Sequence, residues 1–520
     1  MKPDWSRAVA LGLLACLAGA PLRGQNPEDA RRPRPHKPIV IAPDPPTLNA
    51  SDVQSVVQNA AQSVNSSAMV IAVTDRQGNI LAVFREPSAP TTSTGNFSAL
   101  VDTNELAVAL ARTAGFFSND QAPLSSRTVR FISGIHFPPG IMYTSNAPLY
   151  GIENTNRGCS LNARFVPGQE IPPATSIDGS APGLGIITGK ADLNDSDPNA
   201  VNPGGVPLFK QGVLVGGIGV AGVAPDIAEF AAFSAAVGAG FGAAPAAPGV
   251  VFINGISLPF VNQTTQPAGT SPGIFNATSS GTFLMGPADS PAPPPEGDLV
   301  APRAGTVGTL TQTDVQGIVN AAVATANATR AVIRLPIGSR ARMAIAVADL
   351  DGTLLALHRM PDATVFSIDV AVAKSRNVIY FSGAQRQPQD LPQVPIGTAV
   401  TNRTIGYGAQ PFYPPGIDGS SPGPFFDLYK LDVANPCTQG LQPASPNQNG
   451  VVFFPGSLPL YKNGVLVGGL GVSGDGVDQD DYVTSGAAAG FAAPAAIEAD
   501  QLIVDGVRLP YLKFPRNPTD

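Results

Sequence analysis

The chain has 520 residues, a length at which one hydrophobic core no longer suffices and two or more domains are expected. Charged residues make up 13% of it, about half of the usual ~25%, whereas glycine (56) and proline (53) are abundant, so long ordered loops are expected. The formal net charge of -7 offers no cationic surface to a phosphate backbone, which argues against nucleic acid as a partner.

The N-terminus predicts export from the cytoplasm. Lys2 and Arg7 precede an apolar run over residues 8–20 that ends in Ala-Gly-Ala, the small-x-small pattern of a signal-peptidase site. We expect a signal peptide over residues 1–24, a flexible proline-rich leader over residues 25–47, and a secreted or periplasmic protein.

A lipoprotein signal is the alternative reading of this segment, because Leu-Leu-Ala-Cys16 resembles a lipobox whose cysteine would be acylated and anchor the chain. The apolar run is too short for a conventional transmembrane helix, and no other stretch contains about 18 or more consecutive apolar residues. We therefore expect no integral membrane segment once the signal is removed.

After the leader, one unit of elements occurs twice. Each copy opens with an amphipathic helix that has capping-box spacing, Ser51 to Gln54 and Thr313 to Gln316, and continues with a hairpin, an alanine-rich helix and long loops. A second hairpin, a helix that begins with acids and a short apolar strand follow. The paired segments are residues 51–60 and 313–322, 68–86 and 343–360, 105–112 and 369–376, 127–141 and 403–417, 226–240 and 478–490, and 250–260 and 502–511.

The clearest sign of duplication is a phrase of sixteen residues. Pro207–Gly222 reads PLFKQGVLVGGIGVAG and Pro459–Gly474 reads PLYKNGVLVGGLGVSG, with twelve identical positions. Gln-Gly and Asn-Gly between apolar runs predict tight hairpin turns.

The unit order α-β-β-α-loops-β-β-α-β predicts an α/β (α+β) domain with a mainly antiparallel sheet flanked by helices. We expect two tandem domains, residues 48–262 and 308–515, joined over residues 263–307 by a Pro/Gly-rich linker or loosely packed strap. The second copy inserts 12 residues before its first hairpin, and this segment, which contains Arg334, is expected to be a solvated loop.

Gly217–Gly222 and Gly469–Gly474 both fit the dinucleotide fingerprint G-x-G-x-x-G. That fingerprint needs a strand that leads directly into a helix in a parallel βαβ unit, whereas here the strand belongs to a hairpin. We therefore expect the glycines to let a helix or partner domain approach the sheet closely.

The second copy resembles the GlcG/HbpS family. The resemblance rests on Ala346–Met360, which reads AVADLDGTLLALHRM, on Pro459–Asp481, and on the helix that contains Lys374. The first copy is looser, since Leu110 stands where the family has the lysine. The resemblance implies profilin-like domains, here arranged as a pseudo-dimer that forms further oligomers, and it implies binding of haem or a similar ligand.

Five residues are candidates for binding that ligand: His358, Arg359, His136, Arg85 and Lys374. A neutral imidazole is a common axial ligand of haem iron, although a lone histidine is more often a surface or core residue. The arginines end the second strand of matching hairpins, where they would clamp a carboxylate or pair with Asp75 and Asp349. Met360, Tyr407, Tyr413 and Tyr461 are weaker iron ligands, and apolar contacts with arginine–propionate pairs are a further route.

Two cysteines remain after the signal, Cys159 and Cys437. They lie 19 and 21 residues after the matched Pro-Pro-Gly motifs, so a disulfide between the domains is expected in an oxidising compartment, with two buried free thiols as the alternative. No catalytic triad, Cys-x-x-Cys motif or zinc-ligand pattern is evident. The acidic cluster that begins at Asp475 is expected to cap a helix.

Three functions stay open at this point. The first is an exported haem-binding protein of the GlcG/HbpS type, with haem or a similar carboxylated small molecule as ligand. The second is a non-catalytic structural or sensory module that contacts another exported protein. The third is an enzyme that acts on small hydroxy acids or haem, for which no catalytic residues stand out.

Overall fold

The computed structural model describes residues 45–520 apart from residues 173, 243–250 and 277–278, and residues 45–520 form one compact unit. The predicted signal peptide, Cys16 of the alternative lipobox and most of the leader lie outside the described residues. Among the described helices, none combines the length and the apolar character needed to cross a membrane.

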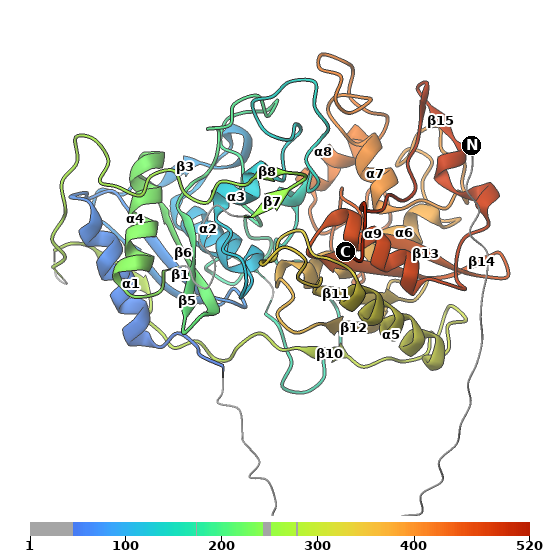
Figure 1. Cartoon of the computed structure of the whole chain (residues 1–520), viewed down its shortest axis with the longest axis horizontal. Helices are drawn as coiled ribbons and strands as arrows, with labels where there is room; N and C mark the ends of the chain where they lie inside the picture. Colours follow the sequence, from blue (N-terminus) through green and yellow to red (C-terminus); the bar gives the residue numbers. More distant parts are fainter. Residues whose placement is uncertain (1–44, 173, 243–250, 277–278) are drawn as a thin grey trace, which may run out of the picture. The chain divides into compact units, whose positions relative to one another are not determined.

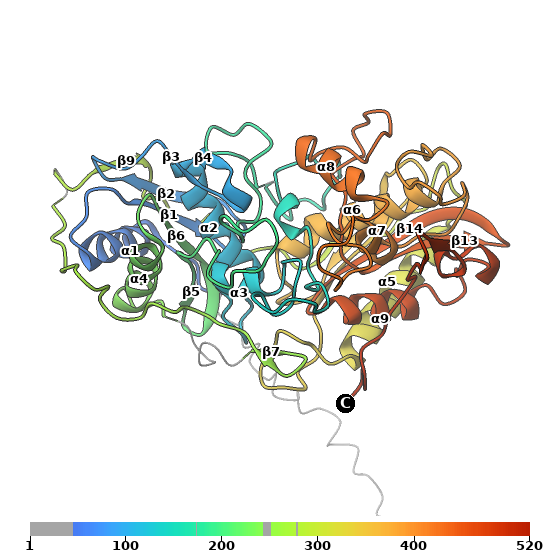
Figure 2. The same ribbon diagram turned by 90° about the horizontal axis from the view of Figure 1, so that it is seen from above.

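The first repeat forms a five-stranded antiparallel sheet of strand order β5-β6-β1-β2-β9 (Figure 1). Helix α2 packs on one face, and α1 and α4, side by side in Figure 2, pack on the other. The elements are α1 (Ala50–Ser63), β1 (Val70–Asp75), β2 (Ile80–Arg85), α2 (Thr103–Phe117), β5 (Gly205–Lys210), β6 (Val213–Ala221), α4 (Pro225–Gly238) and β9 (Thr282–Met285).

The second repeat has the same plan, with strand order β10-β12-β11-β14-β13, α6 on one face and α5 with α9 on the other. This confirms the expected fold class, two antiparallel sheets flanked by helices. The elements are β10 (Gly297–Val300), α5 (Gln312–Ala328), β11 (Met343–Ala348), β12 (Leu354–Arg359), α6 (Phe366–Ser382), β13 (Ser457–Lys462), β14 (Val465–Gly474) and α9 (Val477–Ala487).

Short elements decorate both repeats. Each ends in a small hairpin, β7–β8 or β15–β16, where a single apolar strand with a turn is expected. The short elements are β3 (Thr92–Thr94), β4 (Leu100–Asp102), α3 (Ser126–Phe131), β7 (Phe252–Ile253), β8 (Ile256–Ser257), α7 (Asn402–Gly408), α8 (Phe426–Ala434), β15 (Ile503–Val504) and β16 (Val507–Arg508).

Residues 263–307 do more than link the repeats. They contribute one edge strand to each sheet, because β9 pairs with β2 and β10 pairs with β12. The proline- and glycine-rich composition hid these strands, since each is only four residues long. The domain boundaries stay a prediction.

The glycines of the repeated phrase allow close packing of a helix, as expected. A Cβ added to Gly219 would collide with the carbonyl oxygen of Ala107 on α2, and one added to Gly471 would collide with that of Ala371 on α6. Only a residue without a side chain lets the helix backbone approach the strand this closely. The phrase therefore sets the distance between helix and sheet in both repeats.

The predicted capping boxes are wrong by two residues. The N-cap of α1 is Asn49, whose side chain exchanges hydrogen bonds with Asp52, and the N-cap of α5 is Thr311, which does so with Asp314. A carboxylate at the third position is a strong acceptor and also favours the positive end of the helix. Both helices consequently begin slightly earlier than the sequence pattern indicates.

The repeats meet through two kinds of contact. In the loops, aligned positions come together: His136 stacks on Phe412, as expected of a pseudo-dimer. Elsewhere the contacts are not aligned, since Phe117 stacks on Phe366 with 4.0 Å between ring centroids. The interface therefore contains contacts between aligned positions and contacts between positions that are not aligned.

The segment inserted before β11 also takes part in this interface, which corrects the expectation of a solvated loop. Arg334 is buried and pairs with Asp362 and Asp475 of its own repeat. Asp362 in turn pairs with Arg76 of the first repeat at 2.5 Å. An arginine removed from water needs such partners, so the insertion builds an ion network between the repeats.

Candidate functional site

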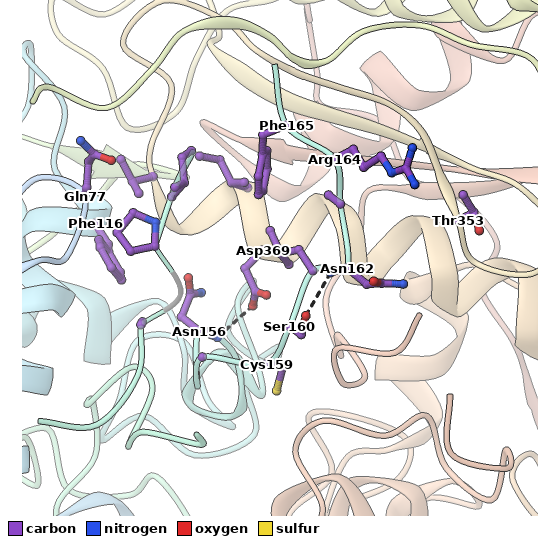
Figure 3. Close-up of a pocket in the computed structure, with 18 of the residues that line it drawn as sticks. Gln77, Phe116, Asn156, Cys159, Ser160, Asn162, Arg164, Phe165, Thr353 and Asp369 are labelled. Atoms are coloured by element: carbon purple, nitrogen blue, oxygen red, sulfur yellow. Dashed lines mark hydrogen bonds between the residues drawn. The ribbon is translucent and has the colours of Figure 1, made fainter. Parts of the chain in front are cut away.

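A pocket of about 800 Å³ lies between the repeats (Figure 3). One wall is the start of α6 with Val365, Ile368 and Asp369, and the turn of the second repeat's first hairpin adds Thr353. The facing wall comes from a loop of the first repeat, and Phe116 at the end of α2 closes one end. Ligand pockets typically measure about 300–1,000 Å³, so this one has the size of a binding site.

The loop that supplies the facing wall is residues 156–172, called the bridging loop from here on. Its start is held by α6, because the Asp369 carboxylate accepts the Asn156 N–H (3.1 Å) and Arg376 donates to the Leu161 carbonyl (2.7 Å). The N–H of Val166 donates to the carbonyl of Leu299 on β10. The second repeat therefore fixes a loop that belongs to the first.

The chain just beyond the bridging loop is held in the same way by α2. Glu105 accepts the Ile177 N–H (2.7 Å), and Arg112 donates to the Thr175 carbonyl (2.5 Å). Glu105 and Arg112 align with Asp369 and Arg376, so an acid and an arginine seven residues later form a clamp on the matching helix of each repeat. The acid–arginine clamp of α6 thus holds the start of the segment that contains the bridging loop, and the clamp of α2 holds its end.

Three charged side chains line the pocket. Arg164, on the bridging loop, is exposed, and Arg303 is half-buried with its guanidinium on the carbonyl of Leu354. Asp369 lies between Phe116 and Arg164 in Figure 3. Burial raises the pKa of Asp369, although hydrogen bonds from Asn449 and Asn156 oppose that effect.

Neither candidate histidine lines this pocket. His136 is buried, with Nε2 3.0 Å from the Asp418 carboxylate, so it bridges the two repeats. His358 lies on β12 with Nδ1 2.7 Å from Asp298 on the edge strand β10. Each imidazole already has a carboxylate partner, and the role of either as an iron ligand stays a prediction.

The two candidate arginines share one structural role. Arg85 donates to the carbonyl of Ala89 and Arg359 to that of Ala363, four residues further on in each case. Neither forms the expected pair with Asp75 or Asp349, because those carboxylates accept backbone N–H groups of nearby turns. Both guanidiniums therefore stabilise the loop after the hairpin, and their ligand role stays a prediction.

Lys374 is completely buried beneath the sheet. Its ammonium donates to the carbonyl of Val472 (2.9 Å) and to the carboxylate of Asp480 (3.1 Å) and lies over the ring of Phe454. Burial lowers the pKa of Lys374 and raises that of Asp480 to about 7. Lys374 is not among the pocket residues, and its ligand role also stays a prediction.

The acidic cluster forms ion pairs rather than caps, which corrects the sequence expectation. Asp475 pairs with Arg334, and Asp478 and Asp481 both pair with Arg403. Helix α9 begins after Gly476 without a side-chain cap. Among the described residues, no group of three or more His, Cys, Asp or Glu side chains is placed to hold a metal ion.

The predicted disulfide is present. Cys159 on the bridging loop is bonded to Cys437 after α8, across 278 residues of sequence. It fastens the bridging loop to the second repeat between the two hydrogen bonds of the α6 clamp. The aligned spacing of the cysteines from Pro-Pro-Gly was sufficient to find this pair.

Sequence reasoning missed the pocket residues Arg164, Arg303 and Asp369. Apart from Cys159, the loop that carries Arg164 lies outside the segments that align between the repeats, so no alignment marked Arg164. A sequence pattern could have marked Asp369, because an acid seven residues before an arginine occurs in both aligned helices. That spacing places both side chains on one helix face, where they reach the same loop.

Comparisons with known proteins find a family whose sequence model matches the second repeat. Residues 310–489 match the family model described as "Haem degrading protein HbpS-like". The corrinoid adenosyltransferase PduO of Salmonella typhimurium is 26% identical over 152 residues, 29% of this chain and 33% of PduO, so the chain spans about a third of that relative's length.

Two solved structures are also similar to part of the chain. A PduOC:heme complex is 25% identical, with a TM-score of 0.23, and the match covers 35% of this chain and 94% of that one. The Klebsiella pneumoniae protein ORFY, assigned to DUF336, is 22% identical, with a TM-score of 0.24 and coverage of 36% and 94%. The family match over residues 310–489 confirms the GlcG/HbpS resemblance for the second half of this chain.

Proposed function

We propose that this protein binds haem, or a similar planar carboxylated molecule, in the pocket between its repeats. The observation that carries the proposal is that α6, which lies within the HbpS-like residues 310–489, forms a wall of a pocket of about 800 Å³ between the repeats. The first repeat is a second, more diverged HbpS-like copy, because it shares the sheet order, the glycine phrase and the helix clamp.

The pocket residues fit the rim and faces of a porphyrin. Phe116, Phe165 and Ile368 offer apolar surface on which a flat ring packs. Arg164 and Arg303 would bind the propionates, since a guanidinium pairs well with a carboxylate. Haem bound there would contribute an iron centre with redox chemistry, but no step can be derived through it, because the described lining residues include no histidine, methionine or tyrosine.

We further propose that the protein works outside the cytoplasm. The predicted signal peptide supports export, and so does the Cys159–Cys437 disulfide, because structural disulfides form and persist in oxidising compartments. Anchoring through Cys16 is the alternative within the same proposal. The expression of a fusion to a periplasmic reporter, followed by fractionation, distinguishes secreted, periplasmic and membrane-anchored forms.

Haem titration of the full chain, followed by absorbance, tests the binding proposal. A saturable Soret shift at one haem per chain is the expected result. The double variant Arg164→Ala/Arg303→Ala should weaken binding by about tenfold or more if both propionates are lost as partners. Arg508→Ala, an exposed arginine on β16 that pairs with Asp500, is the matched control and should bind like the wild type. If the Soret band does not shift at micromolar protein, the proposal of haem binding is wrong.

The same titration tests the earlier ligand predictions one residue at a time. His136→Ala and His358→Ala each change the Soret spectrum only if that imidazole is the iron ligand. Arg85, Arg359 and Lys374 hold the fold together, so their variants need a thermal unfolding curve beside the titration. Loss of binding with unchanged unfolding is the result that assigns any of them to the site.

A further inference from the structure

The pocket lacks what the iron of haem requires. A haem protein supplies a histidine, a thiolate, a methionine or a tyrosine to the metal. The described lining residues include none of these, because the sulfur of Cys159 is bonded to Cys437. His136 and His358 lie elsewhere, each against a carboxylate. The pocket therefore offers partners for the faces and propionates of a tetrapyrrole but no ligand for an iron ion at its centre.

In place of an iron ligand, the pocket holds a hydrogen-bond acceptor. The Asp369 carboxylate receives the Asn156 N–H on one oxygen and the Asn449 side chain on the other, at 3.1 Å each. Two carboxylate oxygens offer about four acceptor positions, so capacity remains for a ligand. Asp369 is half-buried, and the hydrogen bonds from Asn156 and Asn449 hold its carboxylate in position.

A pocket with mixed polar and apolar walls that holds a fixed carboxylate favours a ligand that carries N–H donors. The buried acid needs donors to offset its loss of water, and burial already raises its pKa. Iron porphyrin has no N–H group, since the metal replaces both pyrrole protons. In a metal-free closed ring the N–H groups point inward. Only an open-chain tetrapyrrole presents pyrrole N–H groups to a side chain.

We propose that the preferred ligand of the pocket is a metal-free, open-chain tetrapyrrole. Its pyrrole N–H groups donate to Asp369, its propionates bind Arg164 and Arg303, and its flat conjugated arms pack on Phe116 and Phe165. This inference rests on the proposed function, because it takes the same pocket and narrows the class of ligand. Among the described lining residues, Asp369 is the single acid, so it determines the preference.

Parallel titrations of the full chain with biliverdin, haemin and metal-free protoporphyrin test the proposal. Absorbance gives the affinity, and induced circular dichroism shows that the ligand sits in a chiral site. We expect biliverdin to bind at least about tenfold more tightly than haemin, the effect of one hydrogen bond to a charged group. Asp369→Asn should weaken biliverdin binding by about tenfold more than haemin binding, because only biliverdin loses a hydrogen-bond partner.

Asp226→Asn is the control, because Asp226 is an exposed acid in the first turn of α4 that does not line the pocket. It should bind all three probes like the wild type. If Asp369→Asn fails to fold, the wild-type order of affinities still decides. Haemin binding as tightly as biliverdin, or biliverdin affinity unchanged in Asp369→Asn, overturns the inference and leaves the proposed function intact. Binding of none of the probes overturns both.

Discussion

The two repeats differ in charge at one buried place beneath the sheet. The second repeat has Lys374 and Asp480 there, joined as an ion pair with no exposed surface on the lysine. The aligned residues of the first repeat are Leu110 and Ala228, which are buried in apolar clusters. Helix α2 nevertheless packs on β6 as α6 packs on β14, because the matching glycines set the distance in both.

This difference shows which features of the buried layer the fold requires and which it does not. A buried ion pair is weak evidence for stability, since the free energy lost when both groups leave water offsets most of their attraction. The first repeat shows that leucine and alanine build the same layer without charge. The pair in the second repeat is therefore not a requirement of the fold, and its removal as a unit should be tolerated.

The largest effect is expected when one partner is removed alone. Asp480→Ala leaves the Lys374 ammonium buried without its carboxylate and should lower the free energy of unfolding by about 3–5 kcal/mol. The double variant Lys374→Leu/Asp480→Ala reproduces the first repeat and should recover most of that loss. Urea unfolding followed by circular dichroism measures both. A double variant as unstable as the single one contradicts the comparison.

The same pair should make stability depend on pH. Burial raises the pKa of Asp480 from its ordinary 3.8 to about 7, so between these values the folded chain holds a proton that the unfolded chain releases. The contribution of Asp480 to the free energy of unfolding therefore falls as pH rises through this window. We subtract the free energy of unfolding of the double variant from that of the wild type. Unfolding curves at several pH values should show that this value falls as pH rises from 4 to 7. If this free-energy difference stays constant from pH 4 to pH 7, the pKa of Asp480 is not raised.

Removal of the link between the repeats should have the next largest effect. The double variant Cys159→Ser/Cys437→Ser loses a cross-link over 278 residues, which typically costs about 2–5 kcal/mol. Because Cys159 lies between the clamp contacts of the bridging loop, proteolysis within residues 156–172 should also become faster. Limited trypsin digestion with mass analysis locates the cut. Unchanged stability and digestion would show that the clamp alone holds the loop.

The shared feature of the repeats should respond equally in both. Gly219→Ala and Gly471→Ala each force a Cβ against a helix carbonyl and should cost about 1–3 kcal/mol. Gly317→Ala, in an exposed turn of α5 with open space around it, is the control and should stabilise by about 0.5–1 kcal/mol. Unequal costs at Gly219 and Gly471 would mean that the two sheets do not set the helix distance in the same way.

The elements that the sequence predicted share strong local signals. The repeated phrase carries its own turn and its own glycines, and the similar spacing of Cys159 and Cys437 from the matched Pro-Pro-Gly motifs predicted the disulfide. The edge strands β9 and β10 were missed because four residues in a proline-rich stretch pair only with partners far away in sequence. Such pairing is set by tertiary contacts and leaves little trace in a local pattern.

The pocket was missed for a related reason. Arg164 lies outside the segments that align between the repeats, and the distance between its loop and α6 depends on how the two repeats pack. The histidines, which are chemically the most conspicuous residues, instead pair with Asp418 and Asp298. Residue type alone therefore did not lead to this pocket, whereas the acid–arginine spacing shared by α2 and α6 could have marked Asp369.

The smallest expected effect concerns the turn of the repeated phrase. Gln211 and Asn463 occupy the same exposed turn position, with backbone φ angles of 55° and 50°. Asparagine adopts this left-handed conformation more easily than glutamine. Gln211→Asn should raise the free energy of unfolding by about 0.5 kcal/mol, and Asn463→Gln should lower it by a similar amount. The chain with both changes should return to the wild-type value, because distant sites act additively. Differential scanning calorimetry of the three variants measures this, and a stabilising Asn463→Gln would show that the two turns are not equivalent despite their matching sequence.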